Sequence, residues 1–104
     1  MNMKVKIWVD DVRPAPDGYV WCKSVNAAID KINLYRAFDI EIELLDLYHD
    51  AGEYRNEGGD YIRILDYFEY YDMYDIPIRI HSMNPVGVEN MRRIINRNGW
   101  KEIL

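Results

Sequence analysis

Strand-like apolar runs alternate with segments of helical periodicity along most of the chain. The runs occupy residues 5–9, 19–23, 40–47 and 76–80 and are rich in β-branched and aromatic side chains. Each of the last three runs is followed by a segment whose apolar residues recur at helical spacing. Strands that are separated by helices favour a mainly parallel sheet within one α/β domain.

The three helical segments have clear start signals and apolar faces. Ser24 is a candidate N-cap for the first helix, Asp60 for the second, and Asn84 with Pro85 at the next position for the third. Gly99 is a natural residue at which the third helix ends. The apolar faces consist of Val25, Ala28, Ile29 and Ile32, then Tyr61, Ile64, Leu65 and Phe68, then Met91, Ile94 and Ile95. We therefore expect three helices that each bury one face.

The first two strand-like runs are joined by a loop instead of a helix. Residues 13–18 contain two prolines and a glycine, which prevents regular structure there. Right-handed crossovers then place the first and third strands side by side, with the second strand outside the first. The predicted strand order is 2-1-3-4.

Length and charge narrow the classes of protein further. A chain of 104 residues predicts a single domain over 1–104, and its 49% hydrophobic and 30% charged residues are typical of a globular protein. The formal net charge of −5 argues against general affinity for nucleic acid or anionic membranes. Apolar stretches stay well short of the ~18–20 residues that span a bilayer, and the start lacks a signal-peptide pattern, so we expect a cytoplasmic protein. Cys22 is the only cysteine, which predicts a buried structural thiol and no internal disulfide.

Polar residues cluster at the ends of the strand-like runs, and three of four clusters directly follow a run. The clusters are Asp10-Asp11-Val12-Arg13, Asp46 with His49-Asp50, Gly58-Gly59-Asp60, and His81-Ser82-Met83-Asn84-Pro85. Charged and amide groups are costly to bury unless they are paired or ligating. The carboxyl ends of parallel strands meet at one edge of the sheet, where open α/β sheets bind ligands. We therefore expect a site at this edge.

Adjacent carboxylates at a strand end are typical of a divalent-cation site. On an extended backbone Asp10 and Asp11 point to opposite sides, so one can face a ligand while the other caps the loop or pairs with Arg13. Mg²⁺ prefers oxygen ligands of this kind. Simple turn chemistry is the alternative for the pair. Convergence with Asp46 and Asp50 would favour the cation.

Both histidines follow strands and are candidates for proton transfer. An imidazole ordinarily titrates near neutral pH, so His49 and His81 facing a phosphate can serve as general acid and general base. Ser82 and Asn84 can donate hydrogen bonds to phosphate oxygens, although Asn84 can equally be only an N-cap. The helix that starts at Pro85 also favours an anion at this edge. A satisfied structural histidine is the alternative for either ring.

Tyrosines crowd the end of the second predicted helix. The group comprises Tyr67, Tyr70, Tyr71 and Tyr74, with Asp66, Glu69 and Asp72 on the outer side of the same segment. One buried face cannot hold all of these rings. Because exposed tyrosines are common at protein contacts, this acidic, tyrosine-rich surface is a candidate for binding a protein partner.

The motifs together resemble those of the cyclic-phosphate-processing receiver-like family. The matching strings are Asp10-Asp11-x-Arg13-x-x-Pro16, His49-Asp50-x-Gly52, Gly59-Asp60-Tyr61 and His81-Ser82-x-Asn84-Pro85-x-Gly87, spread over almost the whole chain. The last string is the most specific of them. The resemblance implies a shortened response-regulator receiver domain with a three-layer, flavodoxin-like fold, which binds a divalent metal and processes cyclic phosphate groups.

Residue roles also follow from this resemblance. It implies Mg²⁺ or Mn²⁺ at Asp10 and Asp11, proton transfer by His49, His81 and Asp50, and phosphate binding by Arg13, Ser82 and Asn84. Asp46, two residues before Tyr48 and on the same side of the extended strand, is the candidate third metal ligand in place of the missing carboxylate. The domain would be a metal-assisted phosphoesterase acting on a cyclic or terminal phosphate of a nucleotide or an ADP-ribose derivative. Tyr48 stands where the family is expected to have a carboxylate. This departure favours the alternative of a non-catalytic module that binds a protein.

Overall fold

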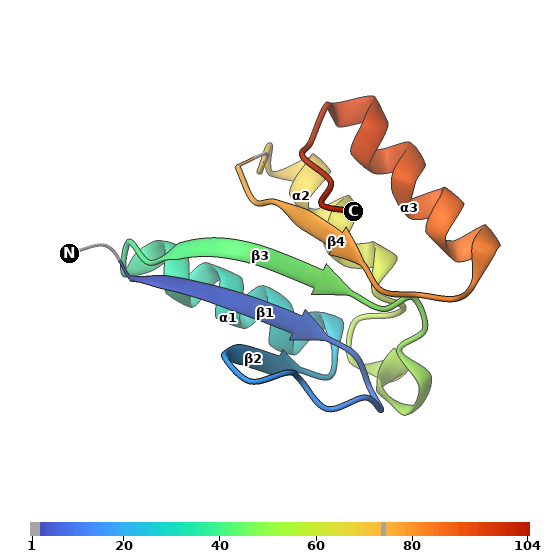
Figure 1. Ribbon diagram of the computed structural model, residues 1–104, viewed down its shortest axis with the longest axis horizontal. Coiled ribbons are helices and arrows are strands. Elements are labelled where there is room, and N and C mark those ends of the chain that lie inside the picture. Colours follow the sequence, from blue (N-terminus) through green and yellow to red (C-terminus); the bar gives the residue numbers. More distant parts are fainter. Residues whose placement is uncertain (1–2, 74) are drawn as a thin grey trace.

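The computed structural model describes residues 3–73 and 75–104, and these form one four-stranded parallel sheet with helices packed against it (Figure 1). The elements are β1 (Lys4–Val9), β2 (Tyr19–Cys22), α1 (Val25–Ala37), β3 (Glu41–Leu47), the short 3₁₀ helix η1 (Gly52–Asn56), α2 (Ile62–Tyr70), β4 (Ile78–Ile80) and α3 (Pro85–Asn98). The strand order is β2-β1-β3-β4, and every neighbouring pair is parallel, so the order predicted from the sequence is confirmed.

The helices lie against one face of the sheet, which leaves the opposite face open. The chain moves in the same direction across the sheet from β2 to β3 and from β3 to β4, and right-handed crossovers therefore put α1 and α2 on the same side. Both helices pass behind the strands in Figure 1, and α3 packs against α2. The predicted receiver-like α/β fold with three helices is confirmed. β1 and β2 are joined by a loop, so this connection supplies no helix for the second face.

Alternation along the strands separates the two faces. Ile7 and Val9 of β1 are 0% exposed and belong to the core beneath the helices. Lys6 and Trp8, which alternate with Ile7 and Val9 along β1, project from the open face. Trp8 lies opposite Trp21 of β2 in the parallel register, so the aromatic and basic side chains of neighbouring strands share the open face. Cys22 is buried, as expected for a structural thiol.

The helix starts follow the sequence signals with one exception. Ser24 Oγ accepts from the backbone N–H of Ala27 at 3.0 Å, and Asn84 Oδ1 accepts from that of Gly87 at 3.1 Å, so both predicted caps are confirmed. Asp60 does not cap α2; its Oδ1 accepts from the backbone N–H of Ala51 at 3.1 Å and so holds the start of η1. Within the described ranges, no helix is both long and apolar enough to cross a membrane.

The segment after α3 turns back onto the outer edge of β4. Gly99 ends α3 in a left-handed conformation (φ 66°), which glycine adopts without steric cost. The backbone N–H of Ile78 donates to the carbonyl of Lys101 at 2.9 Å, and that of Ile103 donates to the carbonyl of Ile78 at 2.7 Å. A single parallel bridge thus joins Glu102 to β4, a pairing that the sequence pattern did not predict.

Candidate functional site

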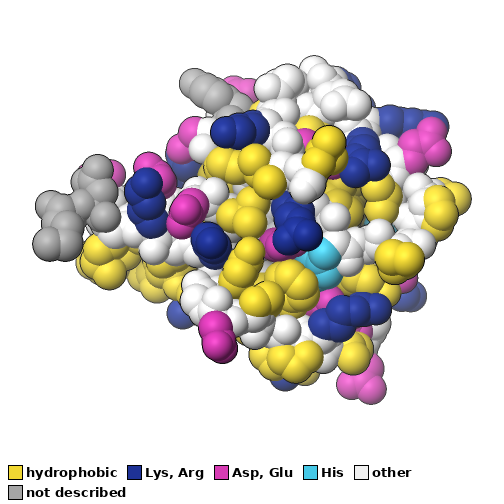
Figure 2. Space-filling model, in the orientation of Figure 1, with side chains coloured by type: hydrophobic (Ala, Val, Ile, Leu, Met, Phe, Trp, Pro, Cys, Tyr) yellow, Lys and Arg dark blue, Asp and Glu magenta, His cyan; other side chains and the backbone are white. Residues whose placement is uncertain are grey.

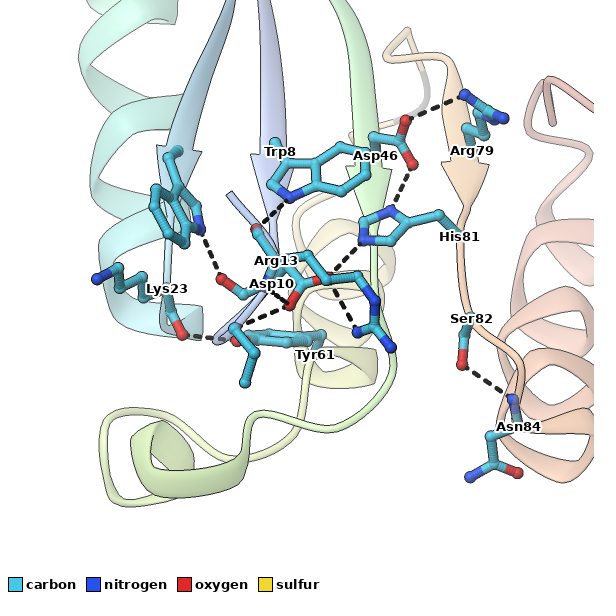
Figure 3. Close-up of polar contacts among 12 residues, drawn as sticks. Trp8, Asp10, Arg13, Lys23, Asp46, Tyr61, Arg79, His81, Ser82 and Asn84 are labelled. Carbon is cyan, nitrogen blue, oxygen red and sulfur yellow. Dashed lines mark hydrogen bonds and ion pairs between the residues drawn. The ribbon is translucent and has the colours of Figure 1, made fainter. Parts of the chain in front are cut away.

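The carboxyl ends of β1, β3 and β4 bring the predicted polar clusters to one edge of the sheet. Asp10 directly follows β1, Asp46 is the penultimate residue of β3, and His81 directly follows β4. Figure 3 shows these three side chains meeting between the strands. The expectation that residues distant in sequence converge at this edge is therefore correct for Asp10, Asp46 and His81.

His81 bridges the two aspartates through both of its ring nitrogens. Its Nδ1 lies 2.7 Å from Asp46 Oδ1, and its Nε2 lies 3.0 Å from Asp10 Oδ2. A neutral imidazole carries one N–H and can donate to only one carboxylate. The contacts are satisfied together when the ring carries both protons or when one carboxyl is protonated. Because both nitrogens are engaged, His81 in this arrangement has no free nitrogen to offer a ligand.

Both bridged carboxylates are fully buried; Asp10 accepts further hydrogen bonds, whereas Asp46 Oδ2 has a nearby arginine but no hydrogen-bond partner among the described residues. Burial by itself would raise the pKa of Asp10, but the backbone N–H groups of Arg13 and Val12 and the ring of His81 outweigh it and hold that pKa below its ordinary value. Arg13 Nη1 lies 3.5 Å from Asp10 Oδ2, and Arg79 Nη1 lies 3.6 Å from Asp46 Oδ2. With a doubly protonated imidazole, two negative charges are balanced by three positive ones.

Aromatic rings enclose this cluster from the open face of the sheet. The indole of Trp8 stacks on the imidazole of His81 with centroids 3.7 Å apart and an interplanar angle of 7°. Tyr48 stacks on the same imidazole at 5.9 Å, and the guanidinium of Arg13 lies 4.4 Å from the Tyr48 ring centroid. The pKa of Arg13 is raised mainly by Tyr48 and further by Asp10. Tyr48, which stands where a carboxylate was expected, thus supports an arginine at the site.

The adjacent aspartates Asp10 and Asp11 have separate environments. Asp10 Oδ1 accepts from the backbone N–H groups of Val12 and Arg13 at 2.9 and 3.0 Å, so Asp10 is the member that caps the loop. Asp11 instead lies against Gly52 of η1, where a Cβ atom would collide with its carboxylate. Its Oδ1 is buried without a hydrogen-bond partner among the described residues.

The expected metal ligands are not gathered into one group. Asp10 and Asp46 are both bonded to His81, and Asp11 lies apart beside η1. Across residues 3–73 and 75–104, no three His, Cys, Asp or Glu side chains are placed to hold a metal ion together. The side chains as arranged do not fit the Mg²⁺ or Mn²⁺ set expected from the sequence.

His49 belongs to a second cluster, formed with α3. Its Nδ1 lies 3.0 Å from Asp50 Oδ1 and 3.4 Å from Asn84 Nδ2. The ring packs directly over Gly87 in the first turn of α3, where any Cβ atom would overlap the imidazole. Because Asn84 Oδ1 accepts from the Gly87 N–H, the amide nitrogen of Asn84 is the atom turned toward His49. The two histidines are therefore held in different clusters.

The predicted phosphate-binding residues belong to or adjoin the two clusters. Arg13 has a half-exposed side chain, and Ser82 Oγ accepts from the backbone N–H of Asn84 at 3.2 Å (Figure 3). Ser82 also opens onto a shallow groove along the outer side of α3, whose lining includes Met83, Val88, Arg92 and Arg93. Asn84 is both an N-cap and a neighbour of His49, so the two alternatives left open by the sequence are not exclusive.

Sequence reasoning missed three residues that shape the site. Trp8 covers His81, Arg79 neutralises Asp46, and Gly87 makes room for His49. The parallel register places Trp8 and Arg79 directly opposite Asp46, so a known register would have identified both. Gly87 lies inside the most specific motif, where its spacing from Asn84 was the available signal.

A parallel sheet of order β2-β1-β3-β4 with a polar site at its carboxyl edge defines a shortened receiver-type α/β domain. The family model for the cyclic-phosphate processing receiver domain matches residues 5–97 of the 104. The chain therefore belongs to the cyclic-phosphate processing receiver family, and the resemblance seen in its motifs is confirmed. Comparisons with curated proteins and with solved structures gave no match.

Proposed function

We propose that this domain hydrolyses a cyclic phosphodiester at the carboxyl edge of its sheet, with His49 as the proton-transfer residue. The observation that carries the proposal is the placement of His49 between an acceptor, Asp50, and a donor, Asn84, beside the N-terminus of α3. The substrate class is the cyclic phosphate of a nucleotide or of an ADP-ribose derivative, in line with membership of the family.

The neighbours of His49 are compatible with both protonation states of its Nε2. When Nδ1 donates to Asp50 at 3.0 Å, Nε2 is left with a lone pair and can accept a proton. When Nδ1 instead accepts from the Asn84 amide at 3.4 Å, Nε2 carries the proton and can donate it. One imidazole can therefore act first as base and then as acid.

The reaction then needs only water and the phosphodiester. The oxygen of a water molecule forms a bond to phosphorus while one P–O bond of the ring breaks. The proton of the water passes to His49 Nε2 and from there to the departing alkoxide oxygen, which leaves a phosphomonoester and a hydroxyl group. Arg13, Ser82 and Asn84 bind the phosphate oxygens, and the N-terminus of α3 favours the negative charge that develops on them.

His81 has a positioning role in this scheme instead of the proton-transfer role first expected. Both of its nitrogens are bonded to buried carboxylates, so it holds Asp10 and Asp46 together. Asp10 in turn binds the backbone and the guanidinium of Arg13. His81 thereby helps to orient Arg13 toward the substrate through Asp10.

Turnover of 2′,3′-cyclic mononucleotides and of ADP-ribose cyclic phosphate tests the proposal. Each substrate is assayed with EDTA, Mg²⁺ and Mn²⁺, which also decides whether a cation is required. We expect His49→Ala and Arg13→Gln each to reduce kcat/KM at least ~100-fold, the lower range for general acid–base catalysis. Arg36→Gln, the same change at the opposite edge of the sheet, should leave turnover unchanged. Activity that survives in His49→Ala would refute the assignment.

A second candidate function is protein binding through the tyrosine-rich surface. Tyr70 and Tyr71 are 80% and 58% exposed and pack edge to face, with centroids 4.8 Å apart. Tyr67 instead bonds with Asn33 on α1, and Tyr74 lies outside the described residues. Loss of a captured partner in a Tyr70→Ser, Tyr71→Ser double variant, with no turnover of any cyclic phosphate by the unmodified chain, would favour this alternative.

A further inference from the structure

The open face of the sheet carries aromatic rings with basic side chains between them. In the parallel register Lys6 lies opposite Tyr19, and Trp8 lies opposite Trp21. Figure 2 shows this face with Lys and Arg side chains lying among apolar ones over the strands. Parallel sheets are normally covered on both faces. A parallel sheet with a half-exposed aromatic face is therefore unusual, which suggests that this face binds a ligand.

The rings on this face are held in place by the loop between β1 and β2. Trp8 Nε1 donates to the carbonyl of Arg13 at 2.9 Å, and Trp21 Nε1 donates to the carbonyl of Asp10 at 2.7 Å. Trp8 and Tyr19 pack edge to face with centroids 5.9 Å apart. Trp21 remains 37% exposed although its N–H is bonded. The rings are thus fixed before any ligand arrives, which lowers the ordering cost of binding.

Lys6, Lys23 and Arg79 place positive charge on this face, and Glu43 of β3 is an exposed acidic residue beside them. Lys6 Nζ lies 5.5 Å from the Tyr19 ring centroid, and Lys23 Nζ lies 4.5 Å from that of Trp21. Arg79 contributes a half-exposed guanidinium from β4.

The acidic side chains nearest to this face have positive neighbours. Asp10 and Asp46 are buried beside His81 and the arginines, and Glu41 at the amino end of β3 pairs with Lys4.

Several of the acidic residues that give the chain its negative net charge lie on or beside the helices. They include Asp30 on α1, Glu53 and Glu57 in and after η1, and Asp66, Glu69 and Asp72 in and after α2. A net charge of −5 therefore does not describe the open face. Charge complementarity on this face favours an anionic ligand, and the rings favour one with planar groups.

We propose that the open face binds single-stranded nucleic acid, with bases stacked on Trp21 and Tyr19 and phosphates near Lys6, Lys23 and Arg79. Stacking on aromatic rings within a positively charged surface is the general way in which proteins bind single strands. Tyr19 and Trp21 are two residues apart on one strand, about 6–7 Å, so successive planar groups can be accommodated side by side. An acidic peptide would use the cations but not this spacing of rings. The proposal does not depend on cyclic phosphate hydrolysis.

Fluorescence anisotropy with a labelled 12-nucleotide oligouridine, titrated at 50 mM salt and then at rising salt, tests the proposal. We expect binding whose logarithm falls with the logarithm of salt concentration with a slope of roughly −2, which is three phosphates at about −0.7 each. Trp21→Ala should weaken binding about ten-fold through the lost stacking. Lys23→Glu should weaken it and make the slope shallower by about 0.7.

Lys31→Glu is the matched control, because Lys31 is exposed on α1 behind the sheet and undergoes the same charge reversal. It should leave binding unchanged within two-fold. Lys23 is exposed, so its variant separates a binding defect from a folding defect, and circular dichroism checks that all variants are folded. The absence of binding at 50 mM salt, equal effects of Lys31→Glu and Lys23→Glu, or binding of a glutamate-rich peptide in place of the oligonucleotide would each overturn the proposal.

Discussion

Replacing His81 by alanine tests whether the buried charge cluster holds the sheet edge together. The change removes the counter-ion shared by Asp10 and Asp46, both 0% exposed, and the ring on which Trp8 stacks. Removing one partner of a buried ion pair costs about 3–5 kcal/mol. Domains of this size are stable by about 5–15 kcal/mol, so the loss is a large share of the total. At about 2 kcal/mol per M of urea, the unfolding midpoint should fall by roughly 2 M.

Urea denaturation followed by far-ultraviolet circular dichroism at pH 7 measures this loss. The double variant His81→Ala, Asp46→Asn is the control, because it removes one of the two carboxylates left without a counter-ion. We expect it to be more stable than His81→Ala alone, which gives a positive coupling between the two positions. A loss below about 1 kcal/mol for His81→Ala, a value typical of exposed pairs, or no recovery in the double variant would refute the reasoning.

Three further outcomes follow from the same contacts. Gly87→Ala should abolish turnover by displacing His49. It should lower the free energy of unfolding by at most about 2 kcal/mol, because overpacking costs about 1–3 kcal/mol and alanine is about 1 kcal/mol more favourable than glycine in a helix. Urea midpoints and kcat measurements check the two effects. The pKa of Asp10 is lower in the folded chain than its unfolded value of about 3.9. The ionised carboxylate therefore stabilises the fold fully above about pH 4, and this contribution is lost as the pH falls toward the folded pKa. Urea midpoints at pH 7, 4 and 3 measure the loss, and the midpoint of Asp10→Asn should decline less than that of the unmodified chain. Burial raises the pKa of Cys22 to about 11, so its thiol should react with Ellman's reagent at pH 8 only as fast as the chain unfolds.

The fold was predictable because periodicity and connection rules left few alternatives. The apolar face of α2, from Tyr61 to Phe68, is fully buried as predicted, and the crossover rule alone gave the strand order. The same crossover rule, applied to the helices as well as the strands, places α1 and α2 on one face.

The location of the site was predictable, whereas its internal pairing was not. Strand ends had to meet at one edge, so the convergence of Asp10, Asp46 and His81 could be read from the sequence. Whether carboxylates bind a cation or an imidazolium depends on side-chain directions and on the register, which put Trp8 and Arg79 next to Asp46. Likewise, Asp60 is of a residue type that often caps helices, but its carboxylate accepts a hydrogen bond from the Ala51 N–H instead.

The backbone pairing of Ile78 with residues 101–103 has a consequence for how copies of this chain behave at high concentration. A short β4 without that pairing would present unpaired N–H and C=O groups, which are a template for strand addition by another molecule. Here the N–H and carbonyl of Ile78 are already bonded to Lys101 and Ile103, and Arg92 fixes the covering segment through Glu102 at 2.8 Å. The outer edge of the sheet is thereby closed to self-templated growth at Ile78, and this takes only a few residues of irregular chain.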